Sequence, residues 1–119
     1  MGTATKTAKT LLASQSLAAA TAVSVTEWNA STAYGGIAAV KLTNGATAPT
    51  TAPVVTFYVG EATGVKRKLY SASGDTVNLS VNDVVCEIPA SAMFVNVTIT
   101  NGATNAITVE AYGEELTTI

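Results

Sequence analysis

Hydrophobic and polar residues alternate with a period of two along much of this chain, which is the pattern of half-buried β-strands. Val95, Val97 and Ile99 fall on one side of a strand, and the polar residues between them fall on the other. The same alternation runs through 54–59 and 106–112. Valine, isoleucine, threonine and aromatic residues suit such pleated surfaces. The pattern therefore predicts an all-β protein.

Turn-forming residues separate the alternating runs and set the expected number of strands. Asn-Gly pairs at 44–45 and 101–102 are typical of tight turns, and Pro49 and Pro53 mark a loop. We expect about eight or nine short strands, at 7–17, 21–27, 36–44, 53–60, 65–72, 76–80, 84–88, 93–101 and 105–114. This spacing favours an antiparallel β-sandwich, of jelly-roll or immunoglobulin-like type, with a barrel as the main alternative.

The chain contains one internal repeat of a short phrase. Residues 40–47 read Val-Lys-Leu-Thr-Asn-Gly-Ala-Thr, and residues 97–104 read Val-Thr-Ile-Thr-Asn-Gly-Ala-Thr. Each phrase precedes a second predicted strand that ends near a Gly-Glu pair. Two copies are too few for a solenoid. We interpret them as equivalent hairpins in the two halves of one sandwich.

The length of 119 residues corresponds to one domain. We expect a single β-sandwich domain at 10–119, preceded by an extended polar arm at 1–9 that ties subunits together by strand addition. Cys86 is the only cysteine, so it forms no internal disulfide, and we expect it to be a small buried hydrophobe. The N-terminal region matches a signal peptide poorly, which predicts synthesis in the cytoplasm.

Charge and composition exclude several classes of function. Charged residues make up 12% of the chain, against about 25% in an average soluble domain. The net charge of −2 gives no basic footprint for nucleic acid, and no apolar run is long enough for a membrane span. There is no histidine to activate a hydroxyl. We expect no enzyme, no cofactor and no metal; the minor alternative is calcium, at Asp75, Asp83 or the Glu114-Glu115 pair.

Two groups of side chains invite a binding role, and each also has a structural explanation. Lys66, Arg67 and Lys68 either contact an acidic surface or protect a solvated strand from edge pairing. Trp28 and Tyr34 either form an aromatic platform for a sugar or lie in the core or at a seam between subunits. The residues predicted for an interface are Thr3, Thr5, Lys6, Trp28, Tyr34, Lys66, Arg67 and Lys68.

The phrases at 40–49, 54–59 and 95–102 resemble those of small virion proteins of tailed bacteriophages. The resemblance covers about the last two-thirds of the chain. It rests on turn-and-strand phrases, so it transfers no functional residues. It implies a β-sandwich in the phage particle, made in the bacterial cytoplasm.

The low charge agrees with that implication, because interface cores are depleted of Lys, Glu and Asp. We therefore expect a capsid decoration or cement protein that stabilises the head by packing against copies of itself and the major capsid protein or other virion proteins. A tail, neck or fibre-attachment protein is one alternative. A carbohydrate-binding β-sandwich module is the other.

Overall fold

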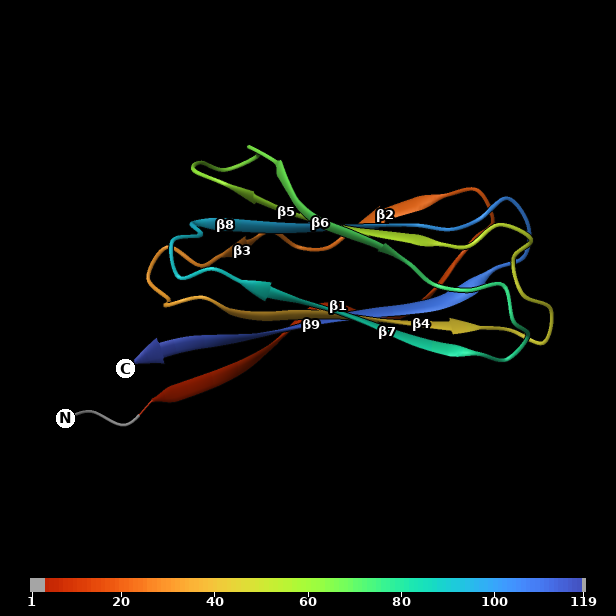
Figure 1. The fold of residues 1–119 in the computed structure, drawn as a ribbon, viewed down its shortest axis with the longest axis horizontal. Helices are drawn as coiled ribbons and strands as arrows, with labels where there is room; N and C mark the ends of the chain where they lie inside the picture. The colour runs from red at the N-terminus through yellow and green to blue at the C-terminus, as the bar shows by residue number, and fades with distance from the viewer. Residues whose placement is uncertain (1–3, 119) are drawn as a thin grey trace.

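The computed structural model describes residues 4–118, which form nine strands in two layers (Figure 1). The strands are β1 (Thr5–Leu17), β2 (Ala22–Ser24), β3 (Trp28–Asn29), β4 (Gly36–Asn44), β5 (Val54–Gly60), β6 (Arg67–Ser73), β7 (Val81–Ile88), β8 (Phe94–Thr100) and β9 (Ile107–Thr118). The all-β prediction is confirmed.

Strand order identifies the type of sandwich. One sheet, sheet A, has the order β1-β9-β4-β7, and the other, sheet B, has the order β2-β8-β5-β6, with β3 also pairing with β8. Every described pairing is antiparallel. Since β2 and β3 both lie along β8, they act as one interrupted strand. The first and last strands are neighbours, and most connections cross between sheets, which is the arrangement of a jelly roll.

The core lies between the two sheets and is built from the predicted alternation. The side chains of Val95, Val97 and Ile99 are fully buried, and so are those of Val55 and Phe57 on the neighbouring strand. Burying each such side chain stabilises the fold by about 1.5–3 kcal/mol relative to leaving it exposed.

Cys86 is part of the same core, on β7. Its thiol is free, and burial raises the pKa of that thiol. The prediction that Cys86 behaves as a small buried hydrophobe is confirmed.

The predicted arm lies partly within the sandwich. Residues 5–9 belong to β1 and pair with β9, where Ala8 is opposite Glu114 and Lys9 is opposite Gly113. Residues 1–3 lie outside the described part of the chain. Residues 5–9 are therefore added as a strand to β9 of their own chain in the described part of the structure.

The strand predicted at 76–80 is wrong. This segment is a turn, and β7 begins after it and runs without a break. The Asp75 carboxylate accepts hydrogen bonds from the Val77 N–H at 3.0 Å and the Ser80 hydroxyl at 2.7 Å. Leu79 adopts a left-handed φ of 61°. The Asp75 side chain thus holds a turn by bonding its own backbone, which competes with strand formation.

The interpretation of the repeated phrases as hairpins is also wrong. β4 leads from sheet A to β5 in sheet B, and β8 leads from sheet B to β9 in sheet A. Both asparagines are buried at these crossings. Asn44 Nδ2 donates to the Val77 carbonyl at 2.9 Å, and Asn101 Nδ2 donates to the Leu17 carbonyl at 3.1 Å. In each copy of the repeat the asparagine therefore ties the start of a crossing loop to a neighbouring segment, because carbonyls shielded from water need donors.

The two glycines of the repeated phrase form a matched pair for mutation. A Cβ added at Gly102 would lie 1.8 Å from the Thr51 carbonyl oxygen, whereas at Gly45 the nearest atom is 3.9 Å away. We expect Gly102→Ala to lower the free energy of unfolding by about 2–4 kcal/mol and Gly45→Ala to change it by less than about 0.5 kcal/mol. Urea denaturation measures both, and equal effects would contradict the close approach at Gly102.

The Asp75 turn predicts a pH dependence of stability. Hydrogen bonds from Ser80 and then Val77 lower the pKa of the Asp75 carboxyl below its ordinary value of 3.8. The ionised carboxylate therefore stabilises the fold above that value, and this contribution is lost as the pH falls through the lowered pKa.

We expect Asp75→Asn to be less stable than the wild type at pH 7 and to lose less stability on acidification. Urea midpoints measured from about pH 5 to about pH 2 cover the range over which the carboxylate is protonated. Parallel curves for the two proteins would show that Asp75 does not carry this pH dependence.

Candidate interaction surface

The residues predicted for an interface lie toward one end of the sandwich but on both layers. The start of β1, strand β3 and the start of β6 lie at the left end of Figure 1. Thr5 and Lys6 are in β1, Trp28 is in β3, Tyr34 precedes β4, Lys66 directly precedes β6, and Arg67 and Lys68 begin it. Thr3 lies outside the described residues. Contact of these residues with a partner stays a prediction.

Trp28 lies in the core of this chain, with 1% of its side chain exposed. Its Nε1 donates to Oε2 of Glu115 at 2.9 Å. Lys9 Nζ lies 3.6 Å from Oε1 of the same carboxylate and 5.6 Å from the centroid of the Trp28 ring. The three side chains join β1 and β9 of sheet A to β3 of sheet B.

This burial corrects the aromatic-platform hypothesis. Tyr34 is 48% exposed, whereas Trp28 has no open ring face for a sugar. The two rings therefore form no shared platform, and the core explanation holds for Trp28. Sequence placed the two aromatics near each other, but which face of β3 turned inward depended on its pairing with β8.

The basic residues occupy an edge of sheet B, because β6 pairs only with β5 among the described strands. Arg67 donates from Nε to Oε2 of Glu61 at 2.9 Å and also contacts Oε1 with a second nitrogen. Hydrogen bonding to Arg67 lowers the pKa of the Glu61 carboxyl to about 2. Both side chains are largely exposed, so the pair stabilises the β5–β6 hairpin little.

The outer face of sheet A carries an apolar patch that the sequence analysis did not single out. Strand register places Ala39 opposite both Val85 and Tyr112, with Ile37 one step along the same face. Val85 is 54% exposed, Tyr112 43% and Ile37 39%. We call these four residues the sheet A patch. Part of the signal was present in the sequence, because apolar residues also occupy some of the outward positions, Ile37 and Ala39 in β4 and Val81 and Val85 in β7.

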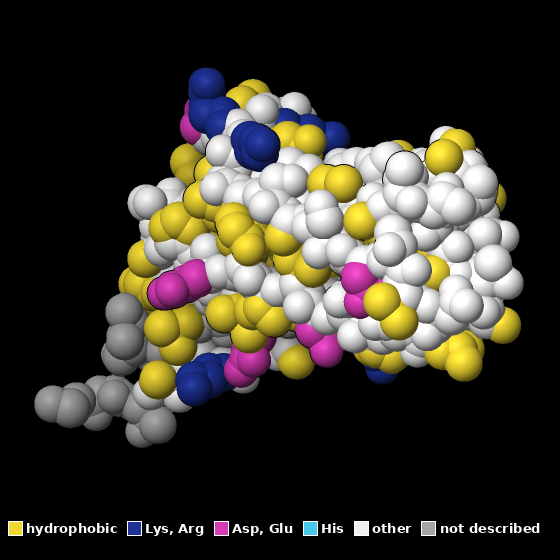
Figure 2. Space-filling model, turned by 45° about the vertical axis from the view of Figure 1, so that its right-hand side comes forward, with side chains coloured by type: hydrophobic (Ala, Val, Ile, Leu, Met, Phe, Trp, Pro, Cys, Tyr) yellow, Lys and Arg dark blue, Asp and Glu magenta, His cyan; other side chains and the backbone are white. Residues whose placement is uncertain are grey.

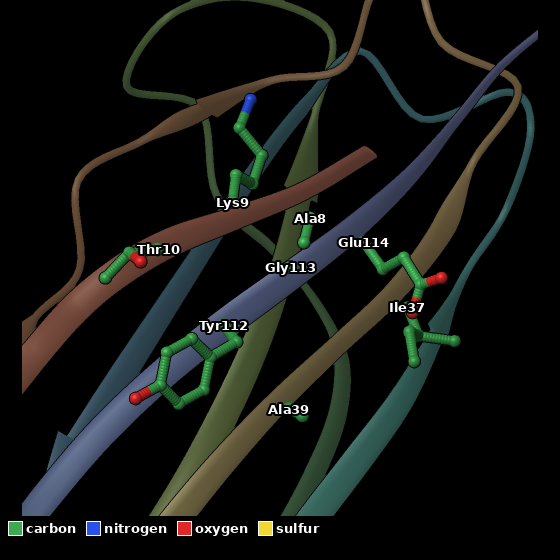
Figure 3. Close-up of a pocket in the computed structure, with 8 residues that line it drawn as sticks. All are labelled: Ala8, Lys9, Thr10, Ile37, Ala39, Tyr112, Gly113 and Glu114. Atoms are coloured by element: carbon green, nitrogen blue, oxygen red, sulfur yellow. The ribbon is translucent and has the colours of Figure 1, made fainter. Parts of the chain in front are cut away.

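Figure 3 shows the centre of this patch, with Tyr112 on β9 and with Ala39 and Ile37 on the neighbouring strand β4. These residues help to line a shallow hollow of about 480 Å³. Lys9, also drawn there, extends away from the patch, consistent with its contact to Trp28. A second hollow of about 720 Å³ continues past Ile37 and Val85 to Tyr34.

Charged side chains frame the sheet A patch. At one end Ile37 lies opposite Glu87 and Glu114. At the other end Lys41 lies opposite Asp83 and is 3.8 Å from Glu110. An apolar centre with a charged rim is the usual anatomy of a protein–protein interface.

The outer face of sheet B differs in chemistry. Its strands carry hydroxyl groups that pair with one another, at 3.3 Å between Ser24 and Thr98 and 3.2 Å between Thr56 and Ser71. Figure 2 shows how few charged side chains the visible face of the molecule carries among its uncharged polar and hydrophobic atoms. Apolar side chains are exposed on sheet B too, at Val54, Leu69 and Tyr70, but the sheet A patch joins apolar residues that lie directly opposite one another on three strands.

Within residues 4–118, no group of three or more histidine, cysteine or acidic side chains could hold a metal ion. The same range contains no helix that is long and apolar enough to cross a membrane.

The Trp28 contacts predict a graded loss of stability. We expect Trp28→Ala to cost about 3–5 kcal/mol, because it leaves a large cavity between the sheets. Trp28→Phe keeps most of the packing but removes the donor to Glu115, so it should cost about 1–2 kcal/mol. Urea denaturation measures both. A folded Trp28→Ala variant of unchanged stability would contradict the core position.

Comparison with known proteins places the chain by its fold. No family model matches it, and no curated protein sequence matches it. Among solved structures, that of Bacillus endospore appendages, described as disulfide-linked pili, is 20% identical with a TM-score of 0.57, covering 99% of this chain and 93% of that one.

Two further structures have viral or prophage origins. A chain of the infectious bursal disease virus Gx strain is 9% identical with a TM-score of 0.64; the match covers 95% of this chain and 32% of the virus chain. The SPBc2 prophage-derived protein YomS is 16% identical with a TM-score of 0.51, covering 96% of each chain. At these identities the likeness concerns the fold: this chain is a β-sandwich similar to those of viral, prophage and appendage proteins.

Proposed function

We propose that this chain is a structural subunit of a tailed-phage particle, acting as a capsid decoration or cement protein. The observation that carries the proposal is the sheet A patch. A sheet with one solvated face normally alternates apolar-in and polar-out. Here the central outward positions of sheet A, at Val85, Ala39 and Tyr112, are apolar, and an exposed apolar patch supports a role in contact with another protein.

The composition supports the same role. A monomeric protein normally relies on Lys, Glu and Asp for solubility, and this chain has few of them. The occurrence of this fold in a virus chain and a prophage-derived protein is compatible with a place in a phage particle.

The proposed mechanism is mechanical and needs no catalysis. The sheet A patch packs against a copy of the chain, the major capsid protein or another virion protein, and removes apolar surface from water. The rim charges around Ile37 orient the contact, since charge complementarity sets register more than affinity. The Thr- and Ser-rich outer face of sheet B remains toward solvent.

The copy number of the chain tests the proposal. Particles of the phage whose genome encodes this chain should contain it in simple ratio to the major shell protein, at hundreds of copies, by quantitative mass spectrometry. Tens of copies or fewer would move it to the tail, neck or fibres. Its absence from the particles would refute a virion role.

A matched pair of variants tests the sheet A patch. We expect Tyr112→Lys to reduce incorporation about tenfold, equivalent to about 1.4 kcal/mol of contact free energy. Thr100→Lys adds the same charge at an exposed position on the other sheet and should be incorporated normally. Thermal unfolding of both purified variants separates lost contact from lost folding. Equal incorporation of the two would refute the patch as the contact.

A further inference from the structure

Of the four sheet edges that the described residues form, three carry features that hinder pairing over at least part of their length. Along β1 the pairing with β9 has register shifts between Thr5 and Lys6 and again after Thr10, whereas residues 6–10 between them pair with β9 in continuous register. The β2–β3 edge is broken into strands of three and two residues. β6 begins with Arg67 and Lys68 and has a register shift against β5. Bulges, short strands and basic residues are the usual devices that keep an edge unpaired.

The fourth edge, β7, is long and regular, and its charged residues are the acidic Asp83 and Glu87. Its eight residues pair with β4 in continuous register, and its sequence, Val-Asn-Asp-Val-Val-Cys-Glu-Ile, contains no proline or basic residue. Val81 and Val85 on its outward side are 50% and 54% exposed. A regular edge strand with exposed apolar residues is a template for strand addition.

The backbone groups that β7 offers can be identified. Asn44 N–H donates to the Ser80 carbonyl at 2.9 Å at the point where β7 begins. Because hydrogen-bonded pairs in an antiparallel ladder recur every second residue, even-numbered residues of β7 bond to β4. The N–H and C=O groups of Asp83, Val85 and Glu87 therefore point away from the sheet.

We propose that this free edge of β7 pairs antiparallel with β1 of a second copy of the chain. The proposal deepens the proposed function and rests on it, since it names the partner and the contact that a structural subunit would use. In sheet A, β1 and β7 run in opposite directions because three antiparallel pairings separate them. A second copy placed alongside in the same orientation therefore continues the antiparallel sheet.

Charge favours β1 over a second β7 as the partner strand. β7 carries Asp83 and Glu87 and no basic residue, whereas β1 carries Lys6 on the outer face of sheet A and no acidic residue; Lys9 is paired with Glu115 of its own chain. Pairing β7 with β7 of another copy about Val85 would put Asp83 opposite Glu87, and like charges directly opposite destabilise a sheet.

One register between β7 and β1 lets their free backbone groups pair and also places compatible side chains opposite each other. Leu116 of β9 exchanges hydrogen bonds with the segment before β4, so alternate residues of β9, including Gly113 and Glu115, face β1. Their partners in β1 are Lys9 and Thr7, which leaves the N–H and C=O groups of Lys6, Ala8 and Thr10 free.

These three residues match the free residues of β7 in order. Antiparallel pairing sets Lys6 opposite Glu87, Ala8 opposite Val85 and Thr10 opposite Asp83. All six side chains lie on the outer face of sheet A, since β1 and β7 are in register with Tyr112 and Ile37 of that face. The contact thus joins an ion pair, an apolar pair and a hydroxyl–carboxylate pair.

The contact is heterologous, because one copy uses β7 and the next uses β1. Such contacts repeat, and they generate a ring if the rotation closes or a filament if it does not. Repetition also places the sheet A patches of successive copies on one face of the extended sheet.

Isotope-mixed cross-linking tests the pairing. An equal mixture of unlabelled and ¹⁵N-labelled chains is treated with a carbodiimide, which couples an amine to a neighbouring carboxylate. We expect mixed-isotope peptides joining Lys6 to Glu87. Lys9 and Glu115, 3.6 Å apart within one chain, provide the control and should give same-isotope peptides alone. Lys6–Glu87 links of the same isotope alone would overturn the proposal.

A charge exchange tests the partner strand. By sedimentation equilibrium, Lys6→Glu and Glu87→Lys should each weaken self-association at least tenfold, and the double variant should recover it to within about threefold of wild type. Glu61→Lys makes the same charge change away from sheet A and should have no effect. Stronger association of Glu87→Lys, or a wild-type chain that stays monomeric at about 1 mM, would overturn the proposal.

Val85→Pro blocks the edge without reversing charge. The Val85 N–H points away from β4, so proline removes an edge donor and leaves the β4 ladder intact. We expect a folded variant, by circular dichroism and thermal unfolding, that no longer associates. A folded variant that associates like wild type would overturn the proposal.

These outcomes are independent of the particle experiment. Particles that contain the chain in the expected ratio, together with no mixed-isotope link, would refute the edge pairing and leave the proposed function standing. A mixed-isotope link, together with absence of the chain from the particles, would support the edge pairing and refute the proposed function.

Discussion

The fold depends on the position of the last strand, β9, between β1 and β4 in sheet A. Sheet A therefore contains no pair of strands that are consecutive in sequence, and it forms only when distant segments meet. The entropy of closing such long loops must be offset by burial between the sheets. The Trp28–Glu115–Lys9 contact lies on this joint, since it ties β9 and β1 to the opposite sheet.

Two kinds of surface remain once the core is closed. Hydroxyl groups on the outer face of sheet B, such as those of Thr56 and Ser71, hydrogen-bond to each other. The outer face of sheet A presents Val85 and Tyr112 to solvent. The free edge of β7 borders that same face. Apolar surface and unpaired backbone thus coincide on one side of the molecule, which is the reason for our proposal that another subunit covers both.

The sequence predicted the strands well where alternation was strong. The strand predicted at 36–44 has those bounds in the structure, and the inward positions of β8, including Val97, are buried as expected. Prediction failed at 76–80, where valine and threonine suggest a strand but Asp75 bonds its own backbone. It also failed for the repeated Asn-Gly phrases, because a turn signal does not say which sheet the next strand enters. The sheet A patch was missed because its residues are adjacent only across strands.

The sequence by itself determined the class of the fold, its strands and the inward side of most of them, because alternation and turn chemistry act over a few residues. It also determined that the chain has no histidine and few charged residues, since no fold can supply side chains that the sequence lacks. Only the tertiary structure decided strand order, the burial of Trp28, the roles of Asn44 and Asn101, and which edge stays open. These depend on contacts between residues far apart in the chain, and local pattern carries no record of such pairings.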